Sequence, residues 1–246
     1  MSRTASAGWI VVFARQPRPG AVKTRLTPPF TPDEAARFYE AMLSDVLELT
    51  ARAASALGLR PVLAVDPPAA RAQMASRAPA SFCVIAQHGG DLGARMARAV
   101  DEGAAAGASP ILLRGSDSPA LADETLAAAR AALERSDLVV CPDRDGGYNL
   151  IGLRHPVPGL FRHPMSTASV LRDTLANAAA AGLSHVVLEP GFDIDVASDL
   201  RWLADAREAS TPRCPRTLAY LDAQDLWRHA GRVARGSGSR SRSDEA

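Results

Sequence analysis

Residues 10–14 read Ile-Val-Val-Phe-Ala, and residues 15–26 continue as Arg-Gln-Pro-Arg-Pro-Gly-Ala-Val-Lys-Thr-Arg-Leu. The first stretch is a continuous apolar run, which is typical of a strand covered on both faces of a sheet. The second contains Gly20, which permits backbone conformations closed to other residues, and the cations Lys23 and Arg25. A basic glycine loop directly after a buried strand favours phosphate binding. A proline-rich surface turn is the alternative interpretation.

Further strands are predicted by apolar runs at 61–65, 82–86, 111–114, 138–141 and 186–188. Alanine-rich stretches between them predict helices at 31–57, 68–77, 91–106, 122–133, 166–181 and 197–209. This alternation predicts an α/β fold: a single doubly wound, mostly parallel sheet with helices on both faces. Residues 145–153 follow a strand without an intervening helix, which predicts an antiparallel edge or a hairpin over the site.

Length and composition indicate one main domain over residues 1–210, an appended helix over 211–230 and a disordered tail over 231–246. The net charge of +1 gives no reason to expect nucleic acid or an anionic membrane as a partner. No stretch approaches 18 consecutive apolar residues, and no signal-peptide stretch precedes Gly8. We therefore expect a cytoplasmic enzyme, and its oligomeric state stays open.

A second motif ends the apolar run at 111–114. Residues 115–119 read Gly-Ser-Asp-Ser-Pro, which places Ser116 and Asp117 just beyond a strand end. Ligands of such sheets bind beyond the carboxyl ends of the strands, and a carboxylate there is a suitable ligand for Mg²⁺ shared with phosphate oxygens. The alternative is that Asp117 only caps a turn before the next helix.

Three more segments carry polar groups in suggestive patterns. Residues 142–150 read Pro-Asp-Arg-Asp-Gly-Gly-Tyr-Asn-Leu, which equally fits a ligand loop and an Asp-Gly hairpin turn. Residues 88–96 form a glycine loop that opens a helix, with Gly93 and Arg95 available to a nucleotide. On a strand, Asp193 and Asp195 would share one face, where a cation would relieve their repulsion. Asp199 is expected in the first turn of the following helix.

Five motifs occur in a fixed order: Pro-x-Pro-Gly-x-Val-Lys-Thr-Arg-Leu, Asp-Leu-Gly-x-Arg-Met, Gly-Ser-Asp-Ser-Pro, Asp-Gly-Gly-Tyr-Asn-Leu-Ile-Gly-Leu and Asp-Ile-Asp-x-x-x-Asp-Leu. Over residues 9–205 the chain resembles a bacterial family with the glycosyltransferase-A fold, often labelled glycosyltransferase-like. It is also similar to the 2-phospholactate guanylyltransferases and, more remotely, to the molybdenum cofactor guanylyltransferases. The family often has Trp before the Ser-Thr pair where this chain has Met165. This difference from the family affects the expected acceptor pocket and not the expected fold.

The resemblance implies roles for individual residues. In the relatives, the loop matching Lys23 and Arg25 holds the triphosphate, the acid matching Asp117 binds Mg²⁺, and the acid matching Asp195 completes the metal site. We expect Lys23, Arg25 and Asp117 to be catalytic. The full nucleotide-binding set is Ala14, Arg15, Gly20, Lys23, Arg25, Gly93, Arg95 and Ser116. The acceptor-binding set is Asp145, Gly146, Gly147, Tyr148, Asn149, Ser166 and Thr167, and the metal set is Asp117, Asp195 and Asp193.

The expected activity is a nucleotidyltransferase that uses Mg²⁺, or Mn²⁺ in its place. A small phosphorylated acceptor would attack the α-phosphate of a nucleoside triphosphate and release pyrophosphate, a reaction that needs positioning and charge neutralisation. The rival is a glycosyltransferase that uses a nucleotide-sugar on the same fold. Against it stand the strongly basic loop and the single Asp117, where glycosyltransferases commonly carry Asp-x-Asp. A third alternative is a non-catalytic nucleotide-binding protein.

Overall fold

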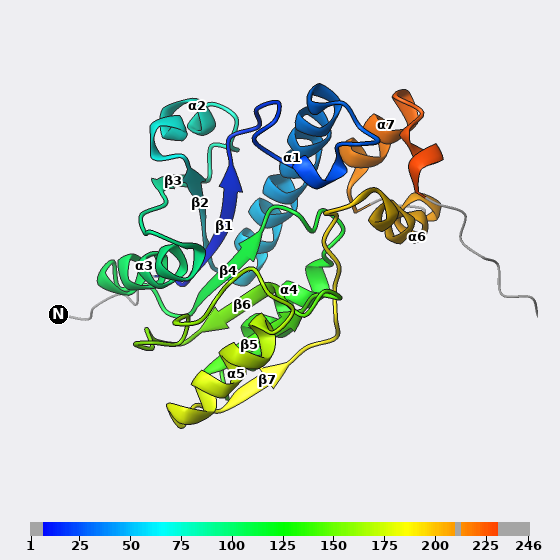
Figure 1. Ribbon diagram of the computed structural model, residues 1–246. Helices are drawn as coiled ribbons and strands as arrows, with labels where there is room; N and C mark the ends of the chain where they lie inside the picture. Colours follow the sequence, from blue (N-terminus) through cyan, green and yellow to red (C-terminus); the bar gives the residue numbers. More distant parts are fainter. Residues whose placement is uncertain (1–6, 210–212, 231–246) are drawn as a thin grey trace, which may run out of the picture.

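A computed structural model gives the structure of the protein and describes residues 7–209 and 213–230. Its centre is one seven-stranded sheet in the order β3-β2-β1-β4-β6-β5-β7, with helices on both faces (Figure 1). The strands are β1 (Trp9–Arg15), β2 (Arg60–Asp66), β3 (Cys83–Ala86), β4 (Ile111–Gly115), β5 (Leu138–Pro142), β6 (Tyr148–Leu153) and β7 (His185–Val187). The predicted fold class and every predicted strand are confirmed.

Strand β6 is the only one of these seven that runs against its neighbours, and it lies inside the sheet between β4 and β5. The prediction of an antiparallel hairpin is correct, because β5 and β6 pair through the turn at residues 143–147, but the alternative of an edge strand is wrong. Gly152 explains the inner position, since a Cβ there would lie 2.8 Å from side-chain atoms of both Leu133 and Val139. A larger residue would push β6 away from the helix that covers this face of the sheet.

The helices are α1 (Pro32–Leu57), α2 (Arg71–Ala75), α3 (Leu92–Ala105), α4 (Asp123–Ala132), α5 (Val170–Ala180), α6 (Ala204–Glu208) and α7 (Pro215–Ala223). Helix α1 begins with a capping box between Thr31 and Glu34 and ends at Gly58, whose φ of 64° suits glycine. Helix α5 begins at Val170 rather than at residue 166, so residues 166–169 remain free to line a cavity. Residues 197–203 form a 3-10 turn before α6.

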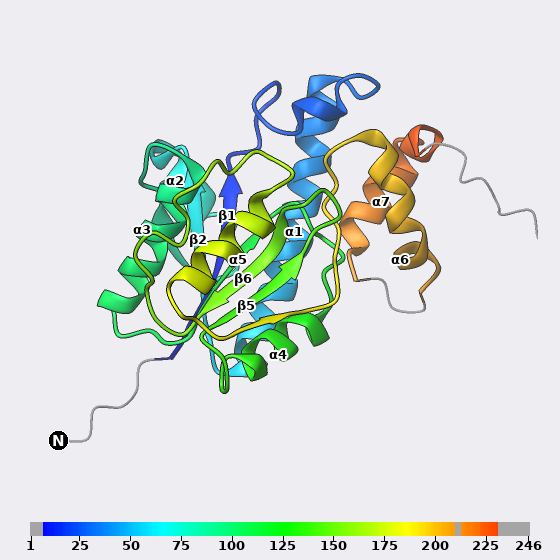
Figure 2. The same cartoon turned by 60° about the horizontal axis from the view of Figure 1, so that its bottom comes forward.

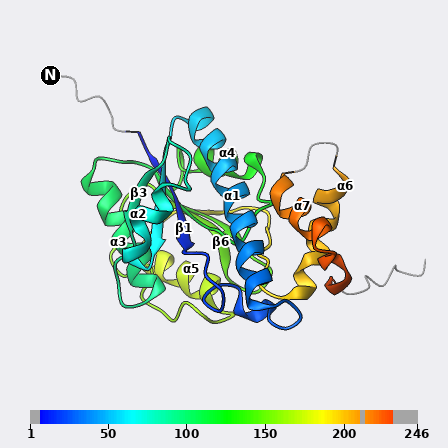
Figure 3. The same cartoon turned by 90° about the horizontal axis from the view of Figure 1, so that it is seen from above.

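Alternate residues of β1 point into two separate cores. Trp9 and Val11 pack with α3 and α5, whereas Ile10 and Val12 pack with α1 on the opposite face. Figure 2 shows α5 in front of the sheet and α1 behind it, and Figure 3, seen from above, shows the two helices on opposite sides of the strands. A strand that is buried on both faces needs apolar residues at every position, which is why residues 10–12 are a continuous Ile-Val-Val run.

The C-terminal segment packs against α1. The sequence predicts one appended helix over 211–230, but α7 ends at Ala223 and a 3-10 turn, η4 (Leu226–His229), follows. The carboxylate of Asp45 in α1 accepts hydrogen bonds from the first backbone N–H groups of α7, at Arg216 and Thr217. The domain division near residue 210 stays a prediction, and the predicted tail over 231–246 lies outside the described residues. Among the described helices, none is long and apolar enough to cross a membrane.

Candidate active site

The basic loop after β1 carries its lysine in a strained conformation. Lys23 has φ 48° and ψ 38°, the left-handed region that non-glycine residues rarely adopt. Val22 and Leu26 are buried on either side and anchor the loop in the core below α1. Strain of this kind persists where the surrounding structure fixes it, and it clusters at functional sites. The packing of the loop therefore fixes the position of Lys23.

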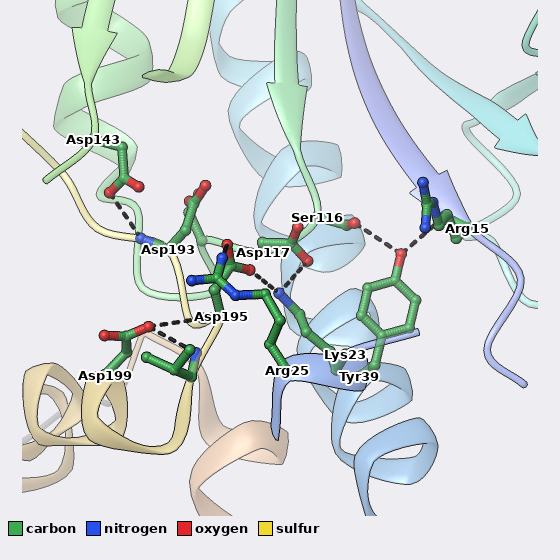
Figure 4. A network of polar contacts seen from close by, with 12 residues as sticks. Arg15, Lys23, Arg25, Tyr39, Ser116, Asp117, Asp143, Asp193, Asp195 and Asp199 are labelled. Carbon is green, nitrogen blue, oxygen red and sulfur yellow. Dashed lines mark hydrogen bonds and ion pairs between the residues drawn. The ribbon is translucent and has the colours of Figure 1, made fainter. Parts of the chain in front are cut away.

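The side chain of Lys23 is buried. It is only 5% exposed, and its Nζ lies 2.7 Å from Asp117 Oδ1 and 2.9 Å from Asp195 Oδ1 (Figure 4). Arg25, by contrast, is 68% exposed, with its Nη1 3.3 Å from Asp195 Oδ2. One ammonium therefore joins two acids that are far apart in the sequence.

The charges of this cluster stabilise one another. Burial alone lowers the pKa of Lys23, but Asp117 and Asp195 outweigh it and hold the pKa above its ordinary value. Burial likewise raises the pKa of Asp195, yet Lys23 and then Arg25 bring it below the ordinary value. Lys23 is thus charged and Asp195 ionised near neutral pH.

Two buried groups hold the loop that contains Asp117. The backbone N–H of Ile194 donates to the carbonyl of Asp117 over 3.0 Å, which joins the two acidic segments directly. Arg114 is fully buried in β4, and its guanidinium donates to the carbonyl of Ser118 and to the hydroxyl of Thr50. Burial lowers the pKa of Arg114 to about 10. Asp117 therefore projects from a loop with little freedom.

Asp193 and Asp195 lie in an irregular segment, not on a strand, so they do not share one face as predicted. Asp193 turns towards Ser118, whose hydroxyl donates to its carboxylate. Burial, with Asp117 and Asp143 nearby, raises the pKa of Asp193 to about 8. Asp199 accepts from the backbone N–H groups of Asp195 and Val196, at the first turn where it was expected.

The carboxylates of Asp117 and Asp195 fit a divalent cation. Both approach a single Lys23 Nζ within 3 Å, so their nearest oxygens already converge on one cationic group. Both side chains are about one-third exposed, and their oxygens are the ligands that Mg²⁺ prefers. The carboxylate of Asp193 already accepts a hydrogen bond from the Ser118 hydroxyl, so it is turned away from the Lys23 ammonium. Among the described residues, no group of three or more potential metal-binding side chains gathers.

Two adjoining cavities of about 570 Å³ each open at this cluster. The first, which we call the basic cavity, is lined by Arg15, Lys23, Arg25 and Arg95. Ala14, Tyr39, Gln87 and Ser116 complete much of its wall. The volume is within the range of small-molecule sites. Most residues of the predicted nucleotide-binding set thus meet in one cavity.

The second, the acidic cavity, is lined by Asp117, Asp143, Asp145, Asp193 and Asp195, with Arg25 as a shared cation. The predicted acceptor residues Gly147, Tyr148, Asn149, Ser166 and Thr167 also line it, beside Met165. Neither polar atom of the Asn149 side-chain amide has a hydrogen-bond partner among the described residues, although both are buried. Buried amides are normally hydrogen-bonded, so this one is suited to a ligand.

Three predicted glycines are not brought to a cavity wall. A Cβ at Gly93 would lie 2.4 Å from the carbonyl oxygen of Phe161, and one at Gly146 would lie 2.1 Å from that of Ala168. Both glycines therefore permit close backbone packing. Gly20 has a φ of 71° and open space around it. It therefore lets the backbone of the basic loop turn, away from the cavity walls.

Sequence reasoning missed Tyr39 and Gln87. The Tyr39 hydroxyl accepts from the backbone N–H of Arg15 and is hydrogen-bonded to Ser116, which joins the ends of β1 and β4 (Figure 4). Gln87 donates from Nε2 to the carbonyls of Ala14 and Ala64. Neither residue belongs to a motif, so only the three-dimensional packing reveals them.

Comparison with known proteins gives a consistent result. The model of a bacterial protein family described as "Uncharacterized protein conserved in bacteria (DUF2064)" matches residues 49–167. A 3-phospho-D-glycerate guanylyltransferase of Phenylobacterium zucineum (strain HLK1) is 32% identical over 212 residues, which are 84% of this chain and 93% of the relative.

Solved structures share the fold. A protein of Desulfovibrio desulfuricans G20, described as a nucleotide-diphospho-sugar transferase, superposes with a TM-score of 0.81 and 30% identity, over 91% of this chain and 97% of that chain. A 4-diphosphocytidyl-2C-methyl-D-erythritol synthase of Anaerococcus prevotii DSM 20548 gives a TM-score of 0.51 at 10% identity, over 85% of this chain and 100% of that chain. The match to this synthase is evidence for a shared fold alone.

Proposed function

The chain belongs to the bacterial DUF2064 family, and on this premise we propose that it is a nucleotidyltransferase acting on a small phosphorylated acceptor. The donor would be a nucleoside triphosphate, and the second product would be pyrophosphate. The broader prediction of a transferase is confirmed, because the guanylyltransferase at 32% identity and the solved structure at 30% identity are both named as transferases.

The observation that carries the proposal is the junction of the two cavities. Arg25, Asp117 and Asp195 line both cavities, with Lys23 between the two acids. The four cations of the basic cavity suit a polyphosphate, and the acidic cavity adjoins the basic cavity. Two substrates that occupy these cavities would meet at the junction, which is the geometry that phosphoryl chemistry needs.

Each group of the junction has a role in this reaction. Lys23 and Arg25 would stabilise the charge on the β- and γ-phosphates and on the departing pyrophosphate. Asp117 and Asp195 would hold Mg²⁺, or Mn²⁺, which supplies charge neutralisation on phosphate oxygens when it is bound. Lys23 would keep the two carboxylates close and ionised before substrates arrive.

The finer identity of the substrates follows the relative. Guanosine triphosphate would be the donor and 3-phosphoglycerate, or a similar phosphorylated acid, the acceptor, because the relative at 32% identity is named for guanylyl transfer to 3-phospho-D-glycerate. The acceptor phosphate would lie at the junction of the two cavities, with the rest of the acceptor in the acidic cavity, next to Asn149, Ser166 and Thr167.

One observation favours a second candidate, transfer from a nucleotide-sugar. The structure from Desulfovibrio desulfuricans is described as a nucleotide-diphospho-sugar transferase and is 30% identical. Two features weigh against this reading. Four cations, Lys23, Arg25, Arg15 and Arg95, line the basic cavity, which suits a triphosphate, and Asp117 stands without a second acid two residues before it.

Calorimetric binding of nucleotides separates the two candidates. GTP with Mg²⁺ should bind at least about tenfold more tightly than GDP, a difference of ~1.4 kcal/mol, because the third phosphate adds negative charge that the cations of the basic cavity attract. The same comparison with ATP, CTP and UTP identifies the base. Equal or tighter binding of GDP or of a GDP-sugar would count against nucleotidyl transfer and favour the second candidate.

A further inference from the structure

A pair of arginines beside the acidic cavity has no role in the reaction described so far. The guanidinium carbons of Arg144 and Arg201 lie 3.9 and 4.5 Å from the ring centre of Trp202. Within residues 7–209 and 213–230, neither guanidinium forms an ion pair, whereas Arg15, Arg25 and Arg95 each pair with an acid. Stacking on an indole holds a guanidinium in place and leaves its N–H edge available.

These three residues line a third cavity of about 240 Å³, which also includes Arg25, Asp143 and Asp195. We call it the Trp202 cavity. It shares Arg25 and four carboxylates with the acidic cavity, so the two adjoin. Its volume is below the usual range for a whole small molecule, which suits one end of a ligand that lies mainly in the acidic cavity.

An acceptor with two anionic ends needs a cation at each end. Five carboxylates line the acidic cavity, and its two cations are Arg25, which faces the junction, and Arg114, which is buried and already bonded to Ser118 and Thr50. Among the described residues, the acidic cavity therefore offers no further cation for a second anion. The Trp202 cavity is also lined by five carboxylates, four of them shared, but there Arg144 and Arg201 add two unpaired cations to Arg25, and a guanidinium edge matches a carboxylate in bidentate geometry.

We propose that Arg144 and Arg201, stacked on Trp202, bind the carboxylate of a phosphorylated carboxylic acid and so select this class of acceptor. The proposal rests on the proposed function, because it assumes that the phosphate of the acceptor lies at the junction of the cavities. The two arginines are specificity residues, and they take no part in the transfer of the nucleotidyl group.

The test compares two acceptors that differ in the carboxylate: 3-phosphoglycerate and glycerol 3-phosphate. In Arg144→Gln and Arg201→Gln, the KM for 3-phosphoglycerate should rise about tenfold, which corresponds to ~1.4 kcal/mol. The kcat and the KM for GTP should stay within twofold of the wild type. The preference for 3-phosphoglycerate over glycerol 3-phosphate should fall by the same factor.

Arg207→Gln is the matched control. Its guanidinium lies 5.0 Å from the ring centre of Trp227 and lines none of the three cavities, so the variant removes a stacked arginine elsewhere. Unchanged acceptor preference in both Arg144→Gln and Arg201→Gln, or a raised KM for GTP in place of the acceptor effect, would overturn the proposal.

A separate measurement distinguishes failure of the proposal from failure of the proposed function. If the wild type releases no pyrophosphate from any nucleoside triphosphate with either acceptor, the proposed function fails. Calorimetric titration with 3-phosphoglycerate then still tests whether Arg144 and Arg201 bind the carboxylate. Binding that is lost in the two variants and kept in Arg207→Gln supports it, and equal binding, or none, in all four proteins refutes it.

Discussion

Replacing Lys23 by methionine should destabilise the protein, because the change leaves Asp117 and Asp195 close together without their shared cation. The Lys23 side chain is 5% exposed, whereas the two carboxylates are 37% and 36% exposed. Removing one partner of a fully buried pair costs ~3–5 kcal/mol. Solvent screens these partly exposed carboxylates, so we expect a loss of ~2 kcal/mol, which lowers the Tm by ~4–8 °C in a protein of this size.

The assay is thermal unfolding in a buffer without divalent cations, followed by the same experiment with Mg²⁺. Because the uncharged thioether would no longer supply a cation between the acids, Mg²⁺ should raise the Tm of Lys23→Met by more than that of the wild type. Arg98→Met is the control, since Arg98 and Glu102 form an exposed pair on α3, worth at most about 0.5 kcal/mol. A Tm of Lys23→Met equal to that of the wild type would refute the ion-pair arrangement.

Three further predictions concern the same site and the C-terminal helix. Asp117→Asn and Asp195→Asn should each abolish Mg²⁺-dependent turnover and leave the circular dichroism spectrum unchanged, and residual turnover close to that of the wild type would contradict this. Arg25→Ala should weaken GTP binding by ~1.5–3 kcal/mol in calorimetry, with no change in Tm because the side chain is 68% exposed. Asp45→Ala should cost ~2–3 kcal/mol in urea unfolding, because three donors at the start of α7 lose their acceptor; a loss below about 0.5 kcal/mol would argue against the cap.

Much of the fold could be predicted because its signals are local. The run at residues 10–14 is apolar at every position, and such a run in a β-α alternation identifies a central parallel strand. The cap of α1 also follows from neighbouring residues, since Thr31 and Glu34 are three positions apart. Each of these features depends on side chains that are close in the sequence, so the pattern alone indicates it.

The position of β6 could not be predicted in the same way. Its antiparallel direction follows from the short connection after β5, but its place between β4 and β5 depends on strand pairing across the whole sheet. Gly152 fits that place because of its contacts with Leu133 and Val139, which the local sequence does not reveal.

The site shows the same division between local and distant information. The motifs brought Lys23, Asp117 and Asp195 to attention, but the burial of Lys23 depends on acids in two other segments of the chain. The contacts of Gly93 with Phe161 and of Gly146 with Ala168 are equally distant in the sequence, so these glycines resembled ligand-binding positions.

Product analysis by ³¹P NMR detects nucleotidyl transfer to the acceptor itself. The full-length protein is incubated with GTP, Mg²⁺ and 3-phosphoglycerate, and the phosphorus signals are followed with time. Pyrophosphate and a new diphosphate that links the guanosine monophosphate to the acceptor should form in equal amounts, and neither should form with Asp117→Asn. No new diphosphate from any nucleoside triphosphate, together with release or transfer of sugar from a GDP-sugar, would contradict nucleotidyl transfer.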